Sequence, residues 1–243
     1  MQAWGLTDTG MVRSQNQDDY AIVKLGRDQL LVLVCDGMGG AKSGNIASKM
    51  AVEVFTEEVK RTVRSAMKQE RIDQMLKGSL ELANKAVYEQ SQISEEYQGM
   101  GTTLVAAFIQ KDHLTVIHVG DSRAYLLNEA GVETITTDHS LVELMVQRGE
   151  LSREAAKNHP GKNLITRAVG TESEVECDLY HHELAKKDCI ILCSDGLSNV
   201  LSSQEILFEV VHGVKKEDCC QRLMKIANFR GSPDNVTVVL VCV

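Results

Sequence analysis

The strongest constraint on how this chain folds is a set of short, continuous apolar runs. Leu30–Cys35 has the length and composition of a β-strand that is buried on both faces. Similar runs, each bounded by Gly, Asp, Asn or a chain end, occur at Thr103–Ile109, Leu114–Val119, Cys189–Cys193 and Val236–Val243. Shorter strand candidates lie at Tyr20–Lys24 and Ala124–Leu127. Strands buried on both faces require other layers to cover them.

Amphipathic segments predict the covering layers. Two long helices are expected between the first two apolar runs, over Ser43 to about Met67 and about Ile72 to Ser91. In the first, apolar residues recur every fourth position in two adjacent rows that form one helix face: Ile46, Met50 and Val54, and Ala47, Ala51, Phe55 and Val59. A capping box at Ser202–Glu205 and a segment at Lys216–Asn228 predict later helices. These patterns alone indicate an α/β-type chain with a buried sheet.

Length and composition favour one domain over residues 1–243. The sequence contains only two prolines and no Gly/Ser-rich or Pro-rich stretch, so no linker is visible among its 243 residues. The polar, weakly periodic stretch at about 137–171 predicts a surface flap with short helices near Leu141–Arg148 and Arg153–Asn158. Long ordered excursions of this kind are often functional.

Charge and cysteine content restrict the possible partners and compartment. The net charge is −8 and no dense Lys/Arg block occurs, which argues against nucleic-acid binding. The N-terminus lacks the features of a secretory signal, and the apolar runs are too short to span a bilayer, so a cytoplasmic location without membrane insertion is expected. The seven cysteines include no CxxC pair, and packing as reduced thiols is the interpretation we favour.

Three strands run directly into an aspartate beside a glycine. The segments are Val34-Cys35-Asp36-Gly37, His118-Val119-Gly120-Asp121 and Leu192-Cys193-Ser194-Asp195-Gly196, and a fourth aspartate, Asp234, precedes the last strand. Carboxylates at strand ends could converge on one cleft, and an all-oxygen ligand set suits Mg²⁺ or Mn²⁺. Asp-Gly also favours β-hairpin turns, so each pair taken singly is more often a turn than a ligand.

The flanking residues favour the metal interpretation. Asp36 opens the run Asp36-Gly37-Met38-Gly39-Gly40, and Asp121 lies in Gly120-Asp121-Ser122-Arg123-Ala124. Two more blocks are Arg13-Ser14-Gln15-Asn16-Gln17-Asp18 and Gly231-Ser232-Pro233-Asp234-Asn235-Val236-Thr237. In this order and at these separations, the blocks resemble the PPM family of metal-dependent protein phosphatases, also called PP2C-like, in its compact bacterial form. The resemblance extends from Gly5 to the final strand.

The resemblance implies a fold and a metal centre. The implied fold is an α+β, four-layer αββα sandwich, in which helices flank two antiparallel β-sheets and a flap subdomain is attached. Asp36 would bridge two Mn²⁺ or Mg²⁺ ions, Gly37 would offer its carbonyl oxygen to one, and Asp195 and Asp234 would complete the other. Two such ions lower the pKa of a shared water, which makes hydroxide available to attack a phosphate ester.

The same resemblance assigns supporting roles. Arg13 corresponds to the family's phosphate-binding arginine, and its planar guanidinium can bind two phosphate oxygens. Asp18 would support the metal shell through waters, and Asn235 would orient a water or a carboxylate ligand. Asp121 and Asp195 correspond to the pair that holds a weaker third cation in bacterial relatives.

One position departs from many eukaryotic members. Met38 lies where those members have a histidine that is thought to protonate the leaving alkoxide, and methionine cannot donate that proton. A water on the third cation is our hypothesis for the proton donor. Met38 itself is expected to pack at the cleft wall.

The function that the resemblance implies is hydrolysis of phosphoserine and phosphothreonine on proteins. The expected partners are phosphorylated proteins and a membrane-anchored Ser/Thr kinase whose action the phosphatase opposes. Two alternatives remain open at this point: a non-catalytic regulator that binds phosphoproteins with the same fold, and a hydrolase of small phosphate esters.

Overall fold

Two antiparallel β-sheets form the centre of the structure. The computed structural model describes residues 1–156 and 158–243, and the side chains of all of these except 40–42. The first sheet has the strand order β1-β11-β10-β7-β8 and comprises Gln2–Asp8, Val236–Cys242, Cys189–Cys193, Arg123–Asn128 and Gly131–Thr134. The second has the order β2-β3-β5-β6-β9 and comprises Asp18–Lys24, Gln29–Met38, Leu104–Gln110, His113–Val119 and Asp178–Glu183. A short strand, β4 (Gly101–Thr102), pairs with the end of β3.

Every apolar run that we predicted to be a strand is a strand. The central residues of β3, from Leu30 to Cys35, are buried on both faces. Burial on both faces is typical of parallel sheets, but here it arises in antiparallel ones, because each sheet is covered by the other sheet and by helices. Sequence patterns missed β1, β8 and β9, which are only partly buried and contain no continuous apolar run.

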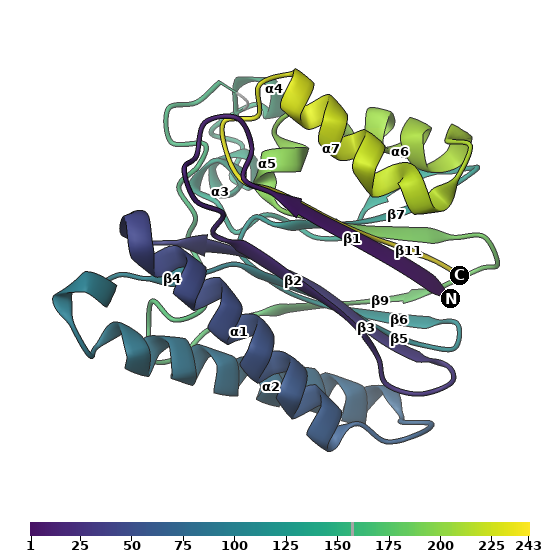
Figure 1. Cartoon of the computed structure of the whole chain (residues 1–243), viewed down its shortest axis with the longest axis horizontal. Coiled ribbons are helices and arrows are strands. Elements are labelled where there is room, and N and C mark those ends of the chain that lie inside the picture. The colour runs from purple at the N-terminus through teal and green to yellow at the C-terminus, as the bar shows by residue number, and fades with distance from the viewer. Residues whose placement is uncertain (157) are drawn as a thin grey trace.

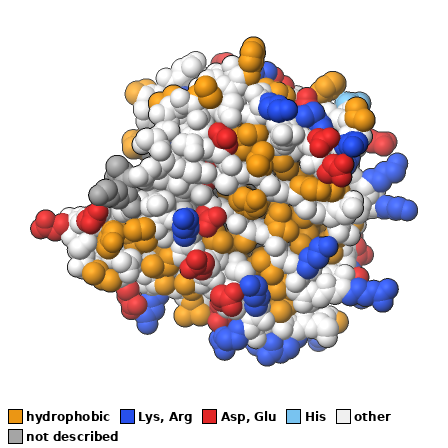
Figure 2. All heavy atoms as spheres, viewed as in Figure 1, with side chains coloured by type: hydrophobic (Ala, Val, Ile, Leu, Met, Phe, Trp, Pro, Cys, Tyr) orange, Lys and Arg blue, Asp and Glu red, His pale blue; other side chains and the backbone are white. Residues whose placement is uncertain are grey.

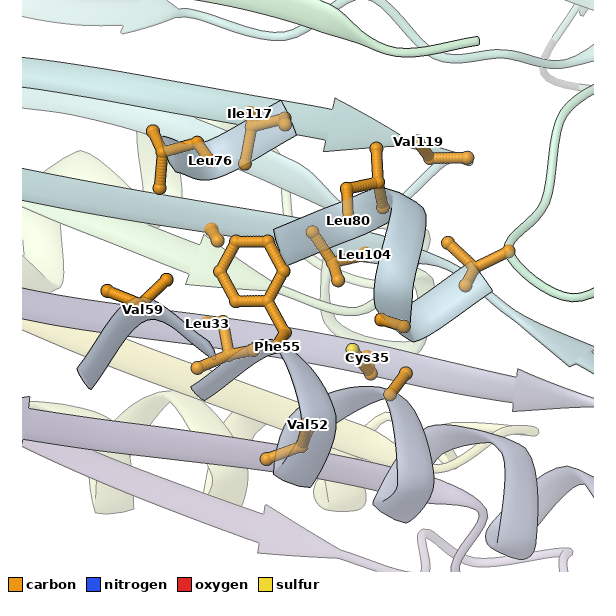
Figure 3. Packing of buried hydrophobic residues seen from close by; sticks show 14 of the residues in the cluster. Leu33, Cys35, Val52, Phe55, Val59, Leu76, Leu80, Leu104, Ile117 and Val119 are labelled. Carbon is orange, nitrogen blue, oxygen red and sulfur yellow. The ribbon is translucent and has the colours of Figure 1, made fainter. Parts of the chain in front are cut away.

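Helices α1 (Gly40–Thr62) and α2 (Gln69–Ser91) cover the outer face of the second sheet (Figure 1). The predicted apolar face of α1 is confirmed, because Phe55 is fully buried and lies between Leu33 of β3 and Leu80 of α2 (Figure 3). Helix α1 ends earlier than its pattern predicts, since Val63 has extended backbone angles (φ −59°, ψ 142°). The two helices therefore pack as an antiparallel pair against one sheet face.

Helices α5 (Asp195–Ser198), α6 (Ser203–His212) and α7 (Cys219–Phe229) cover the first sheet. The predicted capping box starts α6: Ser202 Oγ accepts from Glu205 N at 3.4 Å, and Glu205 Oε2 accepts from Ser202 N at 2.8 Å. The single helix predicted at 216–228 is divided into a 3₁₀ turn, η2 (Lys216–Asp218), and α7. With both outer layers in place, the four-layer αββα sandwich is confirmed.

The inner faces of the two sheets pack directly on each other. Val32 and Val34 of β3 belong to one buried cluster with Leu192 of β10 and Val239 of β11. The edge strands β1 and β2 lie on the face shown in Figure 2, where hydrophobic side chains are interspersed with charges of both signs. Because β3, β10 and β11 share this core, the residues that extend them at one end are brought together.

The flap is anchored to the second sheet. It contains α3 (Leu141–Gln147) and α4 (Arg153–Ala156), close to the predicted helices, although position 157 of the second lies outside the described residues. Isolated β-bridges join Ser140 to Ile165 and Thr102 to Val169. A short 3₁₀ turn, η1 (Glu95–Tyr97), lies between α2 and β4. None of the helices in the described residues combines the length and apolar character that crossing a bilayer requires.

Candidate active site

Asp36 lies within a strand rather than in a turn. It faces Asp18 of β2 in the antiparallel register, and β3 continues through Gly37 to Met38. Its backbone N–H donates to Thr103 Oγ1 at 2.9 Å, and its carbonyl accepts from the Thr103 N–H at 2.9 Å. The hairpin-turn interpretation is therefore wrong for this Asp-Gly pair, and the Asp36 backbone is held on both sides.

Gly37 occupies a space that excludes any side chain. A Cβ atom placed there would lie 2.1 Å from the Gly44 carbonyl oxygen and 2.6 Å from that of Gln17. The Gly37 N–H donates to the Gln17 carbonyl at 3.1 Å. The close approach of three backbone segments explains why glycine follows Asp36.

The first sheet contributes Asp195 and Asp234. Asp195 follows β10 as the first residue of α5, where one carboxylate oxygen accepts from Asn199 Nδ2 at 3.0 Å. Its other oxygen, Oδ1, is buried and has no hydrogen-bond partner among the described residues. Asp234 lies in the turn before β11, and its Oδ2 accepts from Arg13 Nη2 at 2.7 Å.

These groups meet in one pocket of about 510 Å³. Its lining includes Asp36, Asp121, Asp195, Asp234 and Arg13. Burial, followed by repulsion from neighbouring carboxylates, raises the pKa of Asp36 well above its ordinary value, that of Asp195 to about 6 and that of Asp121 to about 7. The shifts indicate that ionised carboxylates in this pocket have lost much of their hydration and repel one another.

The donor set fits divalent cations. Within the described part of the chain, no group of three or more His, Cys, Asp and Glu side chains is gathered closely enough to hold a metal ion by itself. One reason is that Asp234 is turned toward Arg13. The unpartnered oxygen of Asp195 and the raised carboxyl pKa values are nevertheless what a hard, oxygen-preferring cation would satisfy, with the Gly37 backbone in the pocket lining and water as further ligands.

Asn235 ties the N-terminal loop to the start of β11. Its Nδ2 donates to the carbonyls of Thr9 and Gln15, both at 2.9 Å, and its Oδ1 accepts from Gln17 N at 2.8 Å. The loop held in this way carries Arg13. Instead of facing the pocket, the amide therefore positions the backbone from which Arg13 extends.

Asp18 connects the two sheets beside the pocket. Its Oδ2 accepts from Ser194 Oγ and Thr237 Oγ1, both at 2.7 Å, and these residues lie at the ends of β10 and β11. The side chain is buried, and desolvation, opposed by these two hydrogen bonds, raises its pKa to about 7. The direct contacts of Asp18 are thus with protein hydroxyls, and its support of a metal shell through waters stays a prediction.

Asp121 lies on the opposite wall of the pocket, in a turn that several residues fix. Gly120 has φ +108°, and the neighbouring Ser122 Oγ shares a 2.7 Å hydrogen bond with Thr103 Oγ1. Thr103 therefore links the Asp36 backbone to the Asp121 turn. Asp121 also lines a second cavity, of about 640 Å³, between the flap and residues 198–203.

His139, which sequence analysis did not include among the site residues, holds this turn to the flap. Its Nδ1 accepts from Gly120 N at 3.1 Å, and its Nε2 lies 3.1 Å from Asp178 Oδ2. The ring also stacks on the buried His118, with centroids 4.7 Å apart. Neither His139 nor Thr103 lies in a recognisable catalytic motif, and only their position in the fold shows their contribution.

The flap also supplies pocket residues that sequence analysis did not single out. Asn163 and Ile165 line the pocket opposite Met38 and Gly39. Met38 lies in the cleft wall, as expected, and pairs with Gly101 of β4. All the predicted metal and phosphate residues therefore surround one cavity, while Asp18 and Asn235 lie directly behind it.

A fold of two helix-covered antiparallel sheets with an aspartate-rich pocket at one end defines a class of phosphatase, and sequence comparison agrees. The family model described as Protein phosphatase 2C matches residues 12–226. The chain belongs to the protein phosphatase 2C family.

Individual relatives cover the chain almost completely. The Serine/threonine phosphatase stp of Listeria monocytogenes is 37% identical over 242 residues, which are 99% of this chain and 95% of the relative. Protein phosphatase PhpP of Streptococcus pneumoniae is 36% identical over 238 residues, with 97% and 95% covered. The solved structure of the S. agalactiae serine/threonine phosphatase superimposes with a TM-score of 0.93 at 38% identity and covers 98% of both chains. The chain is therefore a protein serine/threonine phosphatase, and its substrates are phosphorylated proteins.

Proposed function

We propose that this phosphatase uses two Mn²⁺ or Mg²⁺ ions held by Asp36, the Gly37 carbonyl, Asp195 and Asp234. The convergence of these carboxylates from both sheets on one pocket, together with the raised pKa values of Asp36 and Asp195, is the observation that carries the proposal. When bound, the two cations supply positive charge that attracts the phosphate and lowers the pKa of water. Asp121, together with Asp195, is proposed to hold a third, weaker cation.

The protein's own residues position the substrate. The Arg13 guanidinium lies at the pocket, half-exposed, and can bind two phosphate oxygens of a phosphoserine or phosphothreonine. Asn235 holds the loop that carries Arg13, and Thr103 holds the backbone of Asp36. Met38 offers no proton to the leaving alkoxide, and a water in the pocket is the proton donor that we propose.

We further propose a cytoplasmic phosphatase that opposes a membrane-anchored Ser/Thr kinase. Seven cysteines without a disulfide among them are consistent with a reducing compartment. The relatives named above are serine/threonine phosphatases of bacteria, and a phosphatase that opposes a bacterial Ser/Thr kinase would belong to this group. The kinase and its substrates would supply phosphoproteins to the pocket.

The test is a cation-dependent phosphopeptide assay. The wild type, stripped with a chelator, should hydrolyse a phosphothreonine peptide only after Mn²⁺ or Mg²⁺ is added. Asp36→Asn should lower activity by at least about 10³-fold, because a neutral amide cannot bridge two dications. Asp112→Asn, at an exposed aspartate outside the pocket, is the matched control and should retain activity.

The same assay separates the alternatives. A non-catalytic regulator would bind the phosphopeptide without releasing phosphate under any cation condition. A hydrolase of small esters would turn over p-nitrophenyl phosphate with a higher kcat/KM than the phosphopeptide. Preference for the phosphopeptide, together with loss of activity in Asp36→Asn, is the result that the proposal predicts.

A further inference from the structure

Two cysteine side chains meet at the end of the first sheet that is remote from the pocket. Cys189 begins β10 and Cys242 ends β11, and the two are direct partners in the antiparallel register. Their sulfur atoms lie 2.6 Å apart. Asp195 follows the other end of β10, and Asp234 precedes the other end of β11. Figure 1 shows the C-terminus at the end of β11 that lies opposite the pocket loops. The sulfur pair is therefore separate from the phosphatase site.

The register gives this pair the backbone geometry that a disulfide requires. Val243 N–H donates to the Asp188 carbonyl at 3.0 Å, so Asp188 and Val243 form a hydrogen-bonded pair. Ser194 N–H likewise donates to Thr237 at the other end of the ladder. Pairs alternate along an antiparallel ladder, which makes Cys189 and Cys242 a non-hydrogen-bonded pair with Cα atoms about 4.5 Å apart. That separation is within the range of disulfides, about 4.4–6.8 Å.

The surroundings distinguish this pair from the other cysteines. Hydrogen bonding from the Cys242 thiol, followed by the charge of Lys216, lowers the pKa of Cys189, although burial opposes the shift. Cys242 is only partly buried, so small oxidants can reach the pair from solvent. Cys193, on the same strand, is fully buried and has a pKa raised to about 12 by desolvation. A thiolate next to a second thiol is the arrangement from which disulfides form.

We propose that Cys189 and Cys242 are a reversible oxidation site that peroxides convert to a disulfide across β10 and β11. Hydrogen peroxide oxidises the first thiol to a sulfenic acid and releases one water. The second thiol displaces a second water as the S–S bond forms. Two thiols and one peroxide thus give one disulfide and two waters, and a thiol reductant reverses the change.

Peptide mapping of the full chain tests the proposal. After brief hydrogen peroxide treatment, alkylation under denaturing conditions and trypsin digestion, residues 188–215 and 231–243 should appear as one cross-linked species. Apart from the alkyl group on Cys193, its mass should be about 2 Da below the sum of the two unalkylated peptides. Fragmentation should place the bond at Cys189 rather than Cys193, and dithiothreitol should restore both free peptides.

Serine variants provide matched controls. Cys189→Ser and Cys242→Ser should each abolish the cross-link, whereas Cys193→Ser, on the same tryptic peptide, should leave it intact. If both cysteines of the wild type remain fully alkylatable after oxidation, the proposal is overturned. A bond from either cysteine to the peptide 217–222, which contains Cys219 and Cys220, would also overturn it.

Discussion

The two sheets contribute to the pocket in different ways. The second sheet presents Asp36 from within β3, where Thr103 forms hydrogen bonds with both the N–H and the carbonyl of its backbone. The first sheet presents Asp195 and Asp234 from just beyond its strands, and Asp234 is engaged with Arg13 in a half-exposed ion pair. One side of the site is thus fixed by a strand, whereas the other depends on turns and on the N-terminal loop. If these carboxylates hold the proposed cations, we expect Asp36 to keep its position and Asp195 and Asp234 to adjust around it.

Removing the carboxylate on the rigid side should have the largest effect on cation binding. Asp36→Asn should abolish high-affinity Mn²⁺ binding, because both proposed ions share this group. Asp234→Asn should retain one ion with weakened affinity for the other. Isothermal titration calorimetry of the two purified variants measures the difference, and equal losses in both would contradict the assigned asymmetry.

On the adjustable side, Arg13 should affect substrate binding more than cation binding. Arg13→Ala should lower kcat/KM for a phosphopeptide by about 10–100-fold, mainly through KM, because the fork to the phosphate oxygens is lost. Arg13→Lys should recover only part of this loss, since it keeps the charge without the fork. Steady-state kinetics at saturating Mn²⁺ checks this, and an unchanged KM in both variants would remove Arg13 from the substrate site.

Asn235 and Thr103, which lie behind the pocket, should affect different kinetic parameters, because each supports a different side of the site. Asn235→Ala loosens the loop that carries Arg13 and should raise KM by about 10-fold. Thr103→Val leaves the Asp36 N–H without its partner and should instead lower kcat and cation affinity by about 10-fold. Thr103→Ser keeps the hydroxyl and is the control. If the two variants changed the same kinetic parameter, the two sides of the site would not be independent.

The smallest expected effect is on stability in the absence of cations. The pKa of Asp18 is raised to about 7 and that of Asp195 to about 6, from 3.8. Between pH 3.8 and these raised pKa values, the folded state therefore binds more protons than the unfolded state. The free energy of unfolding thus falls as pH rises through this window. In a chelator, Tm should fall by about 5 °C from pH 5 to pH 8, and Mn²⁺ should restore it at pH 8.

Asp18→Asn separates this effect from general pH sensitivity. The variant cannot acquire the buried charge, so its Tm should decline less between pH 5 and pH 8 than that of the wild type. A wild-type Tm that stays constant or rises over this range in chelator would contradict the electrostatic account of the pocket.

Sequence patterns predicted the buried parts of the fold better than its edges. Leu30–Cys35 and Cys189–Cys193 stand out because burial on both faces requires continuous apolar residues. Strand β9, with the sequence Asp-Leu-Tyr-His-His-Glu, pairs through its backbone at a sheet edge and carries no such signal. The division of the strands into two antiparallel sheets came from family resemblance, and their order within each sheet was not predicted, since periodicity does not specify which strands are neighbours.

For the site, as for the fold, sequence analysis singled out some residues and missed others. Asp36 and Asp195 stand directly before glycines, and Asp234 lies in a short motif just before the last strand, which makes all three visible in the sequence. The roles of Thr103 and His139 arise from contacts between segments that are distant in the sequence, and no local pattern indicates them. The facing of Cys189 and Cys242 likewise depends on strand register, which the sequence does not reveal.

Anomalous diffraction from crystals grown with Mn²⁺ tests the central claim most directly. Two Mn²⁺ ions about 3.5–4 Å apart are predicted in the pocket, with Asp36 bound to both. The Gly37 carbonyl should bind one ion, and Asp195 and Asp234 should bind the other. An active protein whose Mn²⁺ lies elsewhere, or whose Asp36 contacts no ion, would contradict the account.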